Sequence, residues 1–247
     1  MRLEEAKRED CMVCGKGLDY LASAVSVTCI YCGKKEAGYF RCPMGHYVCD
    51  ECHGKDGLEV ITNFCLSSKS LNPLQMANTI MKHPKIHMIG PEHHPMIAGV
   101  LVTAYKNLTG KIGDDEIREA IKRGHTIPGG YCGLYGTDGA AIACGIAASV
   151  ILKATPLSDT ERIIANMMTS RALSAIANHR GSRCCKRSTW TALETAIQYF
   201  REVLKVEMGY IPASQIQCEY SQRNNHCSKA DCRFYPGKGV DDVSIYA

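Results

Sequence analysis

The spacing of the cysteines near the N-terminus constrains this chain more than any other feature of its sequence. Four closely spaced pairs of candidate ligands lie before residue 53: Cys11 with Cys14, Cys29 with Cys32, Cys42 with His46, and Cys49 with Cys52. A Cys-x-x-Cys turn directs two thiolates at one metal ion, and Gly15 and Gly33 supply the positive φ that such a turn often needs. Eight ligands are enough for two tetrahedral sites, so the sequence predicts a module that binds two zinc ions.

The sequence leaves the pairing of these eight ligands open. In an interleaved arrangement, Cys11, Cys14, Cys42 and His46 share one ion, and Cys29, Cys32, Cys49 and Cys52 share the other. A sequential arrangement is the alternative, and His53 could replace His46 as a ligand. From Cys29 onward the spacing resembles the first six ligands of a RING domain, although the last Cys-x-x-Cys of that pattern is missing and an additional pair precedes it. A rubredoxin-like iron site is the main competitor for one of the pairs.

The fifteen cysteines of the chain require either metal ions or disulfides as an explanation. The first ten residues, MRLEEAKRED, lack the apolar stretch of a secretory signal, so we expect a cytoplasmic protein with reduced, partly metal-bound thiols. The longest apolar segment, 140–152, is shorter than the roughly 20 residues of a membrane-spanning helix. The net charge of +4 is too small to indicate nucleic acid binding, and the basic excess lies beyond residue 66, where we expect any anionic ligand.

The residue pattern predicts two domains, a small β-rich zinc module over residues 1–67 and an all-α helical domain over residues 68–247. Up to residue 66 the chain is rich in Cys, Gly and β-forming residues such as Val25, Val27 and Val60, which is typical of short strands around a metal. A linker-like segment follows. Capping residues and periodicity then predict helices over 73–82, 95–108, 114–122 and 140–152, a helix capped by Ser158 that ends before Gly181, and a helix capped by Ser188.

Two segments of the helical domain carry candidate catalytic cysteines. A glycine-rich loop, PGGYCGLYGTDG, holds Cys132 directly before an apolar helix, and its glycines allow a ligand to approach the backbone. The segment GSRCCKR places Cys184 and Cys185 beside Arg183 and Arg187 at a helix N-terminus, where positive charge lowers the pKa of a thiol. We expect reactive thiols at the three cysteines and an anion-binding role for the two arginines. The alternative is that neither segment has a function: the glycine-rich loop is then only a tight turn, and GSRCCKR only a solvated basic turn.

Together, GGYCGLYGTDGAAIACGIAAS and the later GSRCC resemble the C-GCAxxG-C-C proteins of bacteria and archaea, over residues 94–189. This resemblance implies redox activity or an association with metals. The order of residues differs, because the GCA core is present here as Ala143-Cys144-Gly145. The whole chain is also similar to an uncharacterised prokaryotic cysteine-rich family that is sometimes labelled as methyltransferases.

Three further cysteines, Cys218, Cys227 and Cys232, lie in an aperiodic segment near the C-terminus. Such a group can bind three irons of a [4Fe-4S] cluster. The fourth iron is then either open to substrate or bound by Cys132, Cys184 or Cys185. A third zinc site, with His226 as a ligand, is the alternative.

Within the histidine group His83, His87, His93 and His94, we expect a functional role only for His94. His83 and His87 have i, i+4 spacing, but Pro84 between them argues against one continuous helix that presents both to a metal ion. His94 stands directly before Pro95 at an expected helix start, where its side chain can face a cavity and act as an acid or base near neutral pH. The alternative is that these histidines are surface or capping residues.

These features favour a metalloenzyme that uses an iron–sulfur cluster, reactive thiols or both for redox or sulfur-transfer chemistry on an anionic small molecule. One alternative is an S-adenosylmethionine-dependent methyltransferase, which the glycine loop suggests, although no alternating β/α series that carries such a loop is visible. Another is a non-enzymatic adaptor in which the zinc module binds a protein partner. The sequence specifies neither the substrate nor the oligomeric state.

Overall fold

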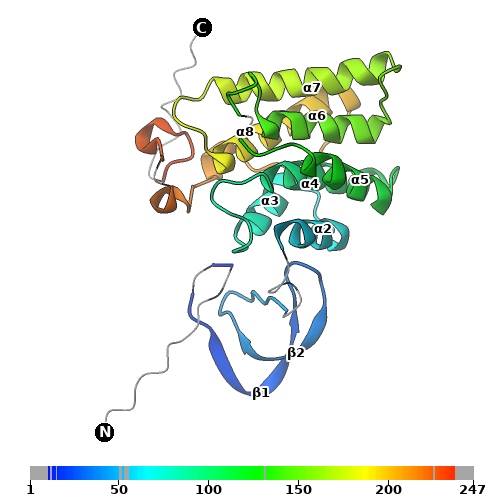
Figure 1. Cartoon of the computed structure of the whole chain (residues 1–247). Coiled ribbons are helices and arrows are strands. Elements are labelled where there is room, and N and C mark those ends of the chain that lie inside the picture. Colours follow the sequence, from blue (N-terminus) through cyan, green and yellow to red (C-terminus); the bar gives the residue numbers. More distant parts are fainter. Residues whose placement is uncertain are drawn as a thin grey trace.

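A small antiparallel sheet near the N-terminus is followed by a larger helical body in the computed structural model (Figure 1). The structure describes residues 11, 13–14, 16–49, 52, 56–130, 132–224 and 226–236. The arrangement confirms the predicted fold class, a β-rich module that precedes a helical domain. No helix in these ranges is both long enough and apolar enough to cross a membrane.

The sheet consists of two strands, β1 (Asp19–Thr28) and β2 (Lys35–Arg41). They pair in antiparallel register, with an irregularity between Tyr20 and Val25. Two strands alone bury too little apolar surface to be stable in water. The cysteine-bearing turns that flank both strands therefore have to stabilise this module.

Seven helices in the described part of the chain form the larger body: α2 (Gly57–Ser67), α3 (Pro73–Met81), α4 (His93–Thr109), α5 (Asp114–His125), α6 (Gly139–Leu152), α7 (Thr160–Ala177) and α8 (Cys185–Tyr199). Helix α4 is central and packs against α2, α3, α5, α6 and α8. Its side chains are buried from residue 93 to residue 105. Helix α8 continues into a π-helical turn (Phe200–Leu204), and three short 3-10 turns follow at Ala213–Gln215, Ser221–Arg223 and Lys229–Asp231.

Most of the predicted helices are present within a few residues of their predicted bounds, but two predicted caps are wrong. Helix α7 begins after Asp159, and the hydroxyl of Ser158 instead hydrogen-bonds to that of Thr155 at 3.0 Å. Helix α8 begins at Cys185, so Ser188 lies within its first turn and donates to Asp138. In both cases another side chain binds the hydroxyl that the sequence pattern assigns to a cap, a nearby one for Ser158 and one distant in the sequence for Ser188.

The segment 57–67 differs from the prediction because it forms helix α2 and no strand. Asp56 caps this helix by accepting a hydrogen bond of 2.9 Å from the backbone N–H of Glu59. The buried face consists of Val60, Ile61, Phe64 and Cys65. We expect Val60 in a strand from its β-branched side chain, but packing against the neighbouring helices overrides that weak preference.

The sheet module and the helical body meet at Cys52 and Tyr31. His83, which follows α3, accepts the backbone N–H of Lys85 through Nδ1, so its Nε2 carries the proton and donates to the carbonyl oxygen of Cys52 at 3.1 Å. The same imidazole meets the buried ring of Tyr31 edge-on, with the ring centroids 4.6 Å apart. These contacts hold the second cysteine-rich turn against the helices.

Candidate metal centres and thiol pocket

The first candidate metal centre lies beside the ends of the sheet. Its four ligand atoms, from Cys11, Cys14, Cys42 and His46, all lie within 4.8 Å of one another. The Sγ atoms of Cys14 and Cys42 are 3.4 Å apart, and His46 Nδ1 lies 3.7 Å from Cys42 Sγ. Thiolates on one tetrahedral zinc ion are about 3.8 Å apart, given Zn–S bonds of roughly 2.3 Å. The group is therefore compatible with one zinc ion.

The second candidate metal centre is formed by Cys29, Cys32, Cys49 and Cys52, whose sulfur atoms also lie within 4.8 Å of one another. The Sγ atoms of Cys32 and Cys49 are 3.6 Å apart. Gly33, in the turn between β1 and β2, has the expected positive φ of 75°. The two groups thus have the interleaved arrangement, while His53 and Gly15 lie outside the described residues.

A pocket near the C-terminus collects four more cysteines, and we call it the four-cysteine pocket. Cys218, Cys227 and Cys232 come from the segment after α8, and Cys184 is the residue directly before α8. Of the three cysteines that the sequence offers as partners for the tail, Cys184 is the one that lines this pocket. The structure therefore brings together thiols that are up to 48 positions apart in the sequence.

Each tail cysteine accepts a hydrogen bond at Sγ from the backbone N–H two residues further along the chain. The pairs are Tyr220 with Cys218 at 3.4 Å, Lys229 with Cys227 at 3.3 Å, and Phe234 with Cys232. The same contact, from Met44 to Cys42 at 3.3 Å, is present in the first metal centre. Such bonds stabilise a thiolate and influence the reduction potential of a bound cluster. The tail thus holds its cysteines as metal-ligand turns do.

The sulfur atoms of the four-cysteine pocket are spaced more widely than those of the N-terminal centres. Among the residues that the structure describes, only the two N-terminal groups bring three or more ligand atoms within 4.8 Å of one another. All four cysteines of the pocket are described, so no three of their sulfur atoms are that close. Their spacing is therefore wider than that of the ligands in either N-terminal group.

Two buried cations, Lys186 and Arg187, flank the four-cysteine pocket, with exposed fractions of 1% and 7%. Lys186 Nζ donates to the carbonyl oxygen of His87 at 3.1 Å and lies 4.7 Å from the centroid of the Tyr220 ring. Arg187 donates to Ser228 Oγ and to two backbone carbonyl oxygens. Burial lowers the pKa of Lys186 to about 8. Neither cation forms an ion pair with a carboxylate of the described residues, so their charges favour an anion nearby.

A second pocket, which we call the thiol pocket, lies where α4, α6 and α8 begin. Its lining residues are His93, His94, Cys132, Asp138, Ala140, Arg183, Cys185 and Ser188. Three of the four predicted catalytic residues, His94, Cys132 and Cys185, therefore meet here, while Cys184 lines the other pocket. Of the two arginines predicted to bind an anion, Arg183 lines the thiol pocket and Arg187 the four-cysteine pocket. The positive ends of three helices converge on the thiol pocket, which favours negative charge in it.

Both histidines of the thiol pocket are neutral and present a lone pair at Nε2. His93 Nδ1 donates to the carbonyl oxygen of Gly90 at 3.0 Å, and His94 Nδ1 donates to that of Ile127 at 3.2 Å. Burial lowers the pKa of His93 to about 3 and also lowers the pKa of His94. His93 Nε2 is buried and has no hydrogen-bond partner. His94 is thus suited to accept a proton, and His93 presents an unsatisfied acceptor.

Asp138 connects the helix starts around the thiol pocket. One carboxylate oxygen accepts the backbone N–H of Ala140 at 2.9 Å, and the other accepts the hydroxyl of Ser188 at 3.3 Å. Burial raises the pKa of Cys132, and a hydrogen bond between its thiol and Asp138 raises it further. Burial likewise raises the pKa of Cys185 to about 11, and the nearby Cys132 contributes to that rise. Both cysteines are therefore thiols at neutral pH unless a base removes the proton.

Residues 61–235 match the family model described as Family of unknown function (DUF5714). The chain belongs to this family. No curated protein and no solved structure matches the chain. The match begins within α2 and ends after Cys232, so it includes the four-cysteine pocket and the thiol pocket and omits both N-terminal metal centres.

Sequence reasoning misses several residues of the thiol pocket in this DUF5714 chain. In the sequence, the place of Asp138 directly before α6 indicates only a helix cap. It does cap that helix, and it also lines the thiol pocket with Cys132. His93 carries no signal beyond its place next to His94. Lys186 reads as part of a solvated basic turn, whereas it is buried. Cys144, the cysteine of the GCA-like core, is a fully buried core residue in α6.

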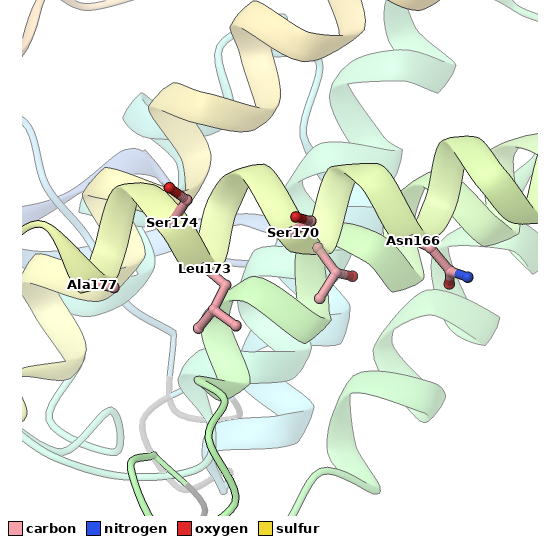
Figure 2. A pocket seen from close by; sticks show the side chains of 6 residues that line it. Asn166, Ser170, Leu173, Ser174 and Ala177 are labelled. Atoms are coloured by element: carbon pink, nitrogen blue, oxygen red, sulfur yellow. The ribbon is translucent and has the colours of Figure 1, made fainter.

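A further open groove of this DUF5714 fold follows α7 and carries no reactive side chain. Figure 2 shows the side chains that line it, all from α7: Asn166, Thr169, Ser170, Leu173, Ser174 and Ala177. None of them titrates near neutral pH or acts as a strong nucleophile. The chemistry of the described residues is concentrated in the two cysteine-lined pockets at the start of α8.

Proposed function

We propose that this protein is an iron–sulfur enzyme in which Cys184, Cys218, Cys227 and Cys232 bind one [4Fe-4S] cluster. In this proposal the thiol pocket performs redox or sulfur-transfer chemistry on an anionic small molecule. The main support for this proposal is that four cysteines line one pocket and that their sulfur atoms are spaced more widely than the ligands of a single zinc ion. A bound cluster of this kind supplies one-electron transfer.

Sulfur spacing supports a cluster over a third zinc ion. Around one zinc ion all thiolates lie about 3.8 Å apart, as in the N-terminal groups. In a [4Fe-4S] cluster each thiolate binds a different iron, so the sulfur atoms lie farther apart. The four-cysteine pocket has the wider spacing, although the N-terminal groups of the same chain have the narrow one. The contrast within one molecule is what favours the cluster.

The charges around the four-cysteine pocket support the same proposal. Four thiolates and a [4Fe-4S] core together carry a net negative charge. The positive charges of Lys186 and Arg187, neither of which forms a salt bridge with a carboxylate of the described residues, would offset it. Burying a cation without a close counter-ion costs several kcal/mol. A negatively charged occupant of the pocket would remove that cost.

The adjacency of the two pockets suggests how the enzyme would work. Cys184 lines the four-cysteine pocket and its neighbour Cys185 lines the thiol pocket. Electrons would therefore travel only a short way between the two. Arg183 and the converging helix starts would hold an anionic substrate, and the neutral His94 would exchange protons with it.

The decisive experiment compares two adjacent cysteines. Wild-type protein purified without oxygen is expected to contain about four iron and four sulfide per chain and about two zinc. Cys184→Ala should lose most of the iron and the visible absorption. Cys185→Ala, its neighbour in the sequence, should keep both, because its thiol faces the other pocket.

Either of two results would overturn this assignment. Zinc without iron in wild-type protein after anaerobic reconstitution would exclude the cluster. Loss of iron in Cys185→Ala, with iron retained in Cys184→Ala, would show that the fourth ligand is Cys185 and that the assignment to Cys184 is wrong. Both variants should retain two zinc ions, since the N-terminal centres are separate from these pockets.

A methyltransferase of the usual fold is not supported. Its glycine loop follows a buried strand of a parallel sheet. Within the described residues the sheet is two-stranded and antiparallel, and the glycine loop around Cys132 lies between α5 and α6.

A further inference from the structure

We infer that Cys132 and Cys185 form a redox-active dithiol whose substrates are small anionic disulfides. The inference deepens the proposed function, because it names a substrate class for the thiol pocket, and it rests on the cluster only for the return of electrons. It is argued from two thiols that line one narrow cavity together with a carboxylate and an exposed arginine.

The two thiols are neighbours in space. Both line the thiol pocket, which has room for little more than one water molecule between its walls. Cys132 lies in a glycine-rich loop, where Gly130 and Gly133 have φ of 87° and 85°. This loop, joined by a single bridge between Cys132 and Thr137, can adjust to closure of a disulfide more readily than a helix can.

A base for the first step is in place at Asp138. Burial keeps Cys132 as a thiol, and only the thiolate attacks a disulfide. The carboxylate of Asp138 lines the same narrow pocket as that thiol and can take its proton. The backbone N–H of Gly139 and the guanidinium of Arg183 act in the opposite sense to burial, because both stabilise the thiolate.

Arg183 provides the selectivity for anions. It is exposed, lines the thiol pocket, and has no carboxylate partner in the described part of the chain. It shares that pocket with both cysteines and with His94, so its positive charge favours an anion near the reacting sulfur atoms. The starts of α4, α6 and α8 add to the same positive potential. A disulfide that carries a carboxylate near its sulfur atoms fits this environment.

The reaction is a thiol–disulfide exchange in two steps. The thiolate of Cys132, the more exposed of the two, attacks one sulfur of the substrate R–S–S–R, which forms a mixed disulfide and releases RS⁻, protonated to RSH. The thiol of Cys185 then gives up its proton and attacks the Cys132 sulfur, which releases the second RSH and closes the Cys132–Cys185 disulfide. One substrate disulfide is reduced to two thiols, and one protein dithiol is oxidised.

Return to the dithiol requires two electrons and two protons. The cluster proposed at Cys184, next to Cys185, would pass the electrons one at a time from a low-potential one-electron carrier protein. The exchange itself needs no cluster. The two parts of the account can therefore fail separately.

The first test is the mass of the linked peptides after a single exposure to dithiodiglycolate, followed by acid quenching and trypsin digestion. We expect a disulfide between Cys132 and Cys185 in wild-type protein. Cys184 lies in the same tryptic fragment as Cys185, so Cys184→Ser is examined as well, and the link should persist in it. Cys185→Ser should instead accumulate the mixed disulfide on Cys132.

The second test separates anion recognition from thiol reactivity. Wild-type protein should form the link faster with dithiodiglycolate than with the uncharged hydroxyethyl disulfide. Arg183→Gln should reduce the ratio of the two rates about two- to fivefold, as expected for one solvent-accessible charge pair. Arg118→Gln, an exposed arginine on α5, is the matched control and should leave the ratio unchanged.

The third test concerns the base. Asp138→Asn keeps an oxygen to cap α6 and should slow formation of the link with both disulfides by a similar factor. Absence of a Cys132–Cys185 link in wild-type and Cys184→Ser proteins would overturn the inference even if the iron content confirms the cluster. Normal formation of the Cys132–Cys185 disulfide in wild-type protein that contains no iron would instead support the dithiol and contradict the proposed cluster.

Discussion

Neighbouring residues in this chain have different surroundings, and their chemistry follows the surroundings. Cys184 and Cys185 are adjacent, yet one lines a pocket with three other cysteines and the other lines a pocket with Cys132 and two histidines. Lys186 and Arg187, the next two residues, are buried and form no salt bridge with a carboxylate of the described residues. Four consecutive side chains at the start of one helix thus lie in different surroundings, because successive side chains on a helix point about 100° apart.

Replacement of Lys186 tests the role of its buried charge. Reduction adds one negative charge to a cluster, and a nearby cation stabilises that state. Lys186→Met removes the charge but keeps much of the apolar stem, so we expect a midpoint potential lower by tens of millivolts. Redox titration followed by electron paramagnetic resonance measures this shift. Lys205→Met, at an exposed position after α8, is the control, and an equal shift in both variants would argue against a local effect of Lys186.

His93 should make the stability of the fold depend on pH. Burial lowers its pKa to about 3 in the folded chain, whereas an unfolded histidine has a pKa near 6.5. Between these values the unfolded state binds more protons, so stability falls as the pH falls below about 6.5. We expect wild-type protein to lose about 2 kcal/mol more than His93→Gln between pH 7 and pH 5.

Urea denaturation at both pH values measures this difference. The metal ligands also bind protons in acid, but their contribution is common to wild type and variant and cancels in the comparison. His125→Gln, at the exposed C-terminal end of α5, serves as the control. A wild-type protein that lost no more stability than His93→Gln would show that His93 is not held neutral by burial.

At the scale of elements, the start of α4 is set by the close approach of α5. A Cβ added to Gly124 would lie 2.7 Å from Cα and 2.9 Å from N of Pro95, and these backbone atoms cannot move aside. Gly124→Ala should therefore destabilise the fold by about 1–3 kcal/mol. Gly129→Ala meets its nearest neighbour, Pro91, at an ordinary 3.7 Å and should change the free energy of unfolding little. Chemical denaturation of the two variants distinguishes a steric effect from a general cost of replacing glycine.

Helices with a repeating buried face could be predicted from the sequence because their pattern is local. Helix α8 is an example, with Trp190, Leu193 and Ile197 buried at the predicted spacing. The prediction was wrong for α2, where cysteine-rich surroundings and Val60 suggested a strand. The sequence does contain the relevant signal, since Asp56 precedes Glu59 by three residues in the manner of a helix cap.

The cysteine sites were predictable to different degrees for a physical reason. Ligands of the N-terminal centres lie in short turns, so their spacing in the sequence already indicates which residues converge. The four-cysteine pocket joins Cys184 to a tail that follows a whole helix, and three cysteines remained equal candidates for that place. Packing of α8 decides among them, since it places Cys185 and Cys132 together elsewhere. No local pattern in the sequence indicates long-range packing of this kind.

At the scale of the whole molecule, the family match and the metal centres divide the chain in different ways. The domain boundary that we predict between residues 67 and 68 stays a prediction, and the match to DUF5714 begins at residue 61, within α2. Helix α2 packs against α4 and α5, although it follows the second metal centre directly. The proposed reaction needs only residues within the match, so the N-terminal module has a different task in this account.

Removal of zinc should show how independent that module is. The two strands cannot bury a core of their own, so we expect the free energy of metal binding to fold this segment. Helix α4 is enclosed on several sides by other helices, so we expect its stability not to depend on the metal. After zinc is withdrawn with a chelator under reducing conditions, we expect the amides of β1 and β2 to lose their protection from hydrogen exchange. Those of α4 and α6 should keep most of theirs.

The contact between His83 and the carbonyl oxygen of Cys52 sets the limit of this effect. It ties the end of the second metal centre to the segment after α3, so partial loss of protection should extend to α3 and stop there. Hydrogen exchange read by mass spectrometry resolves these segments. His83→Gln, which keeps a donor for the carbonyl oxygen, is the control in zinc-loaded protein and should protect β1 and β2 as the wild type does. Simultaneous exposure of α4 on zinc removal would show that the metal centres and the helical core fold as one unit, because a core stabilised by its own packing has no reason to open with the module.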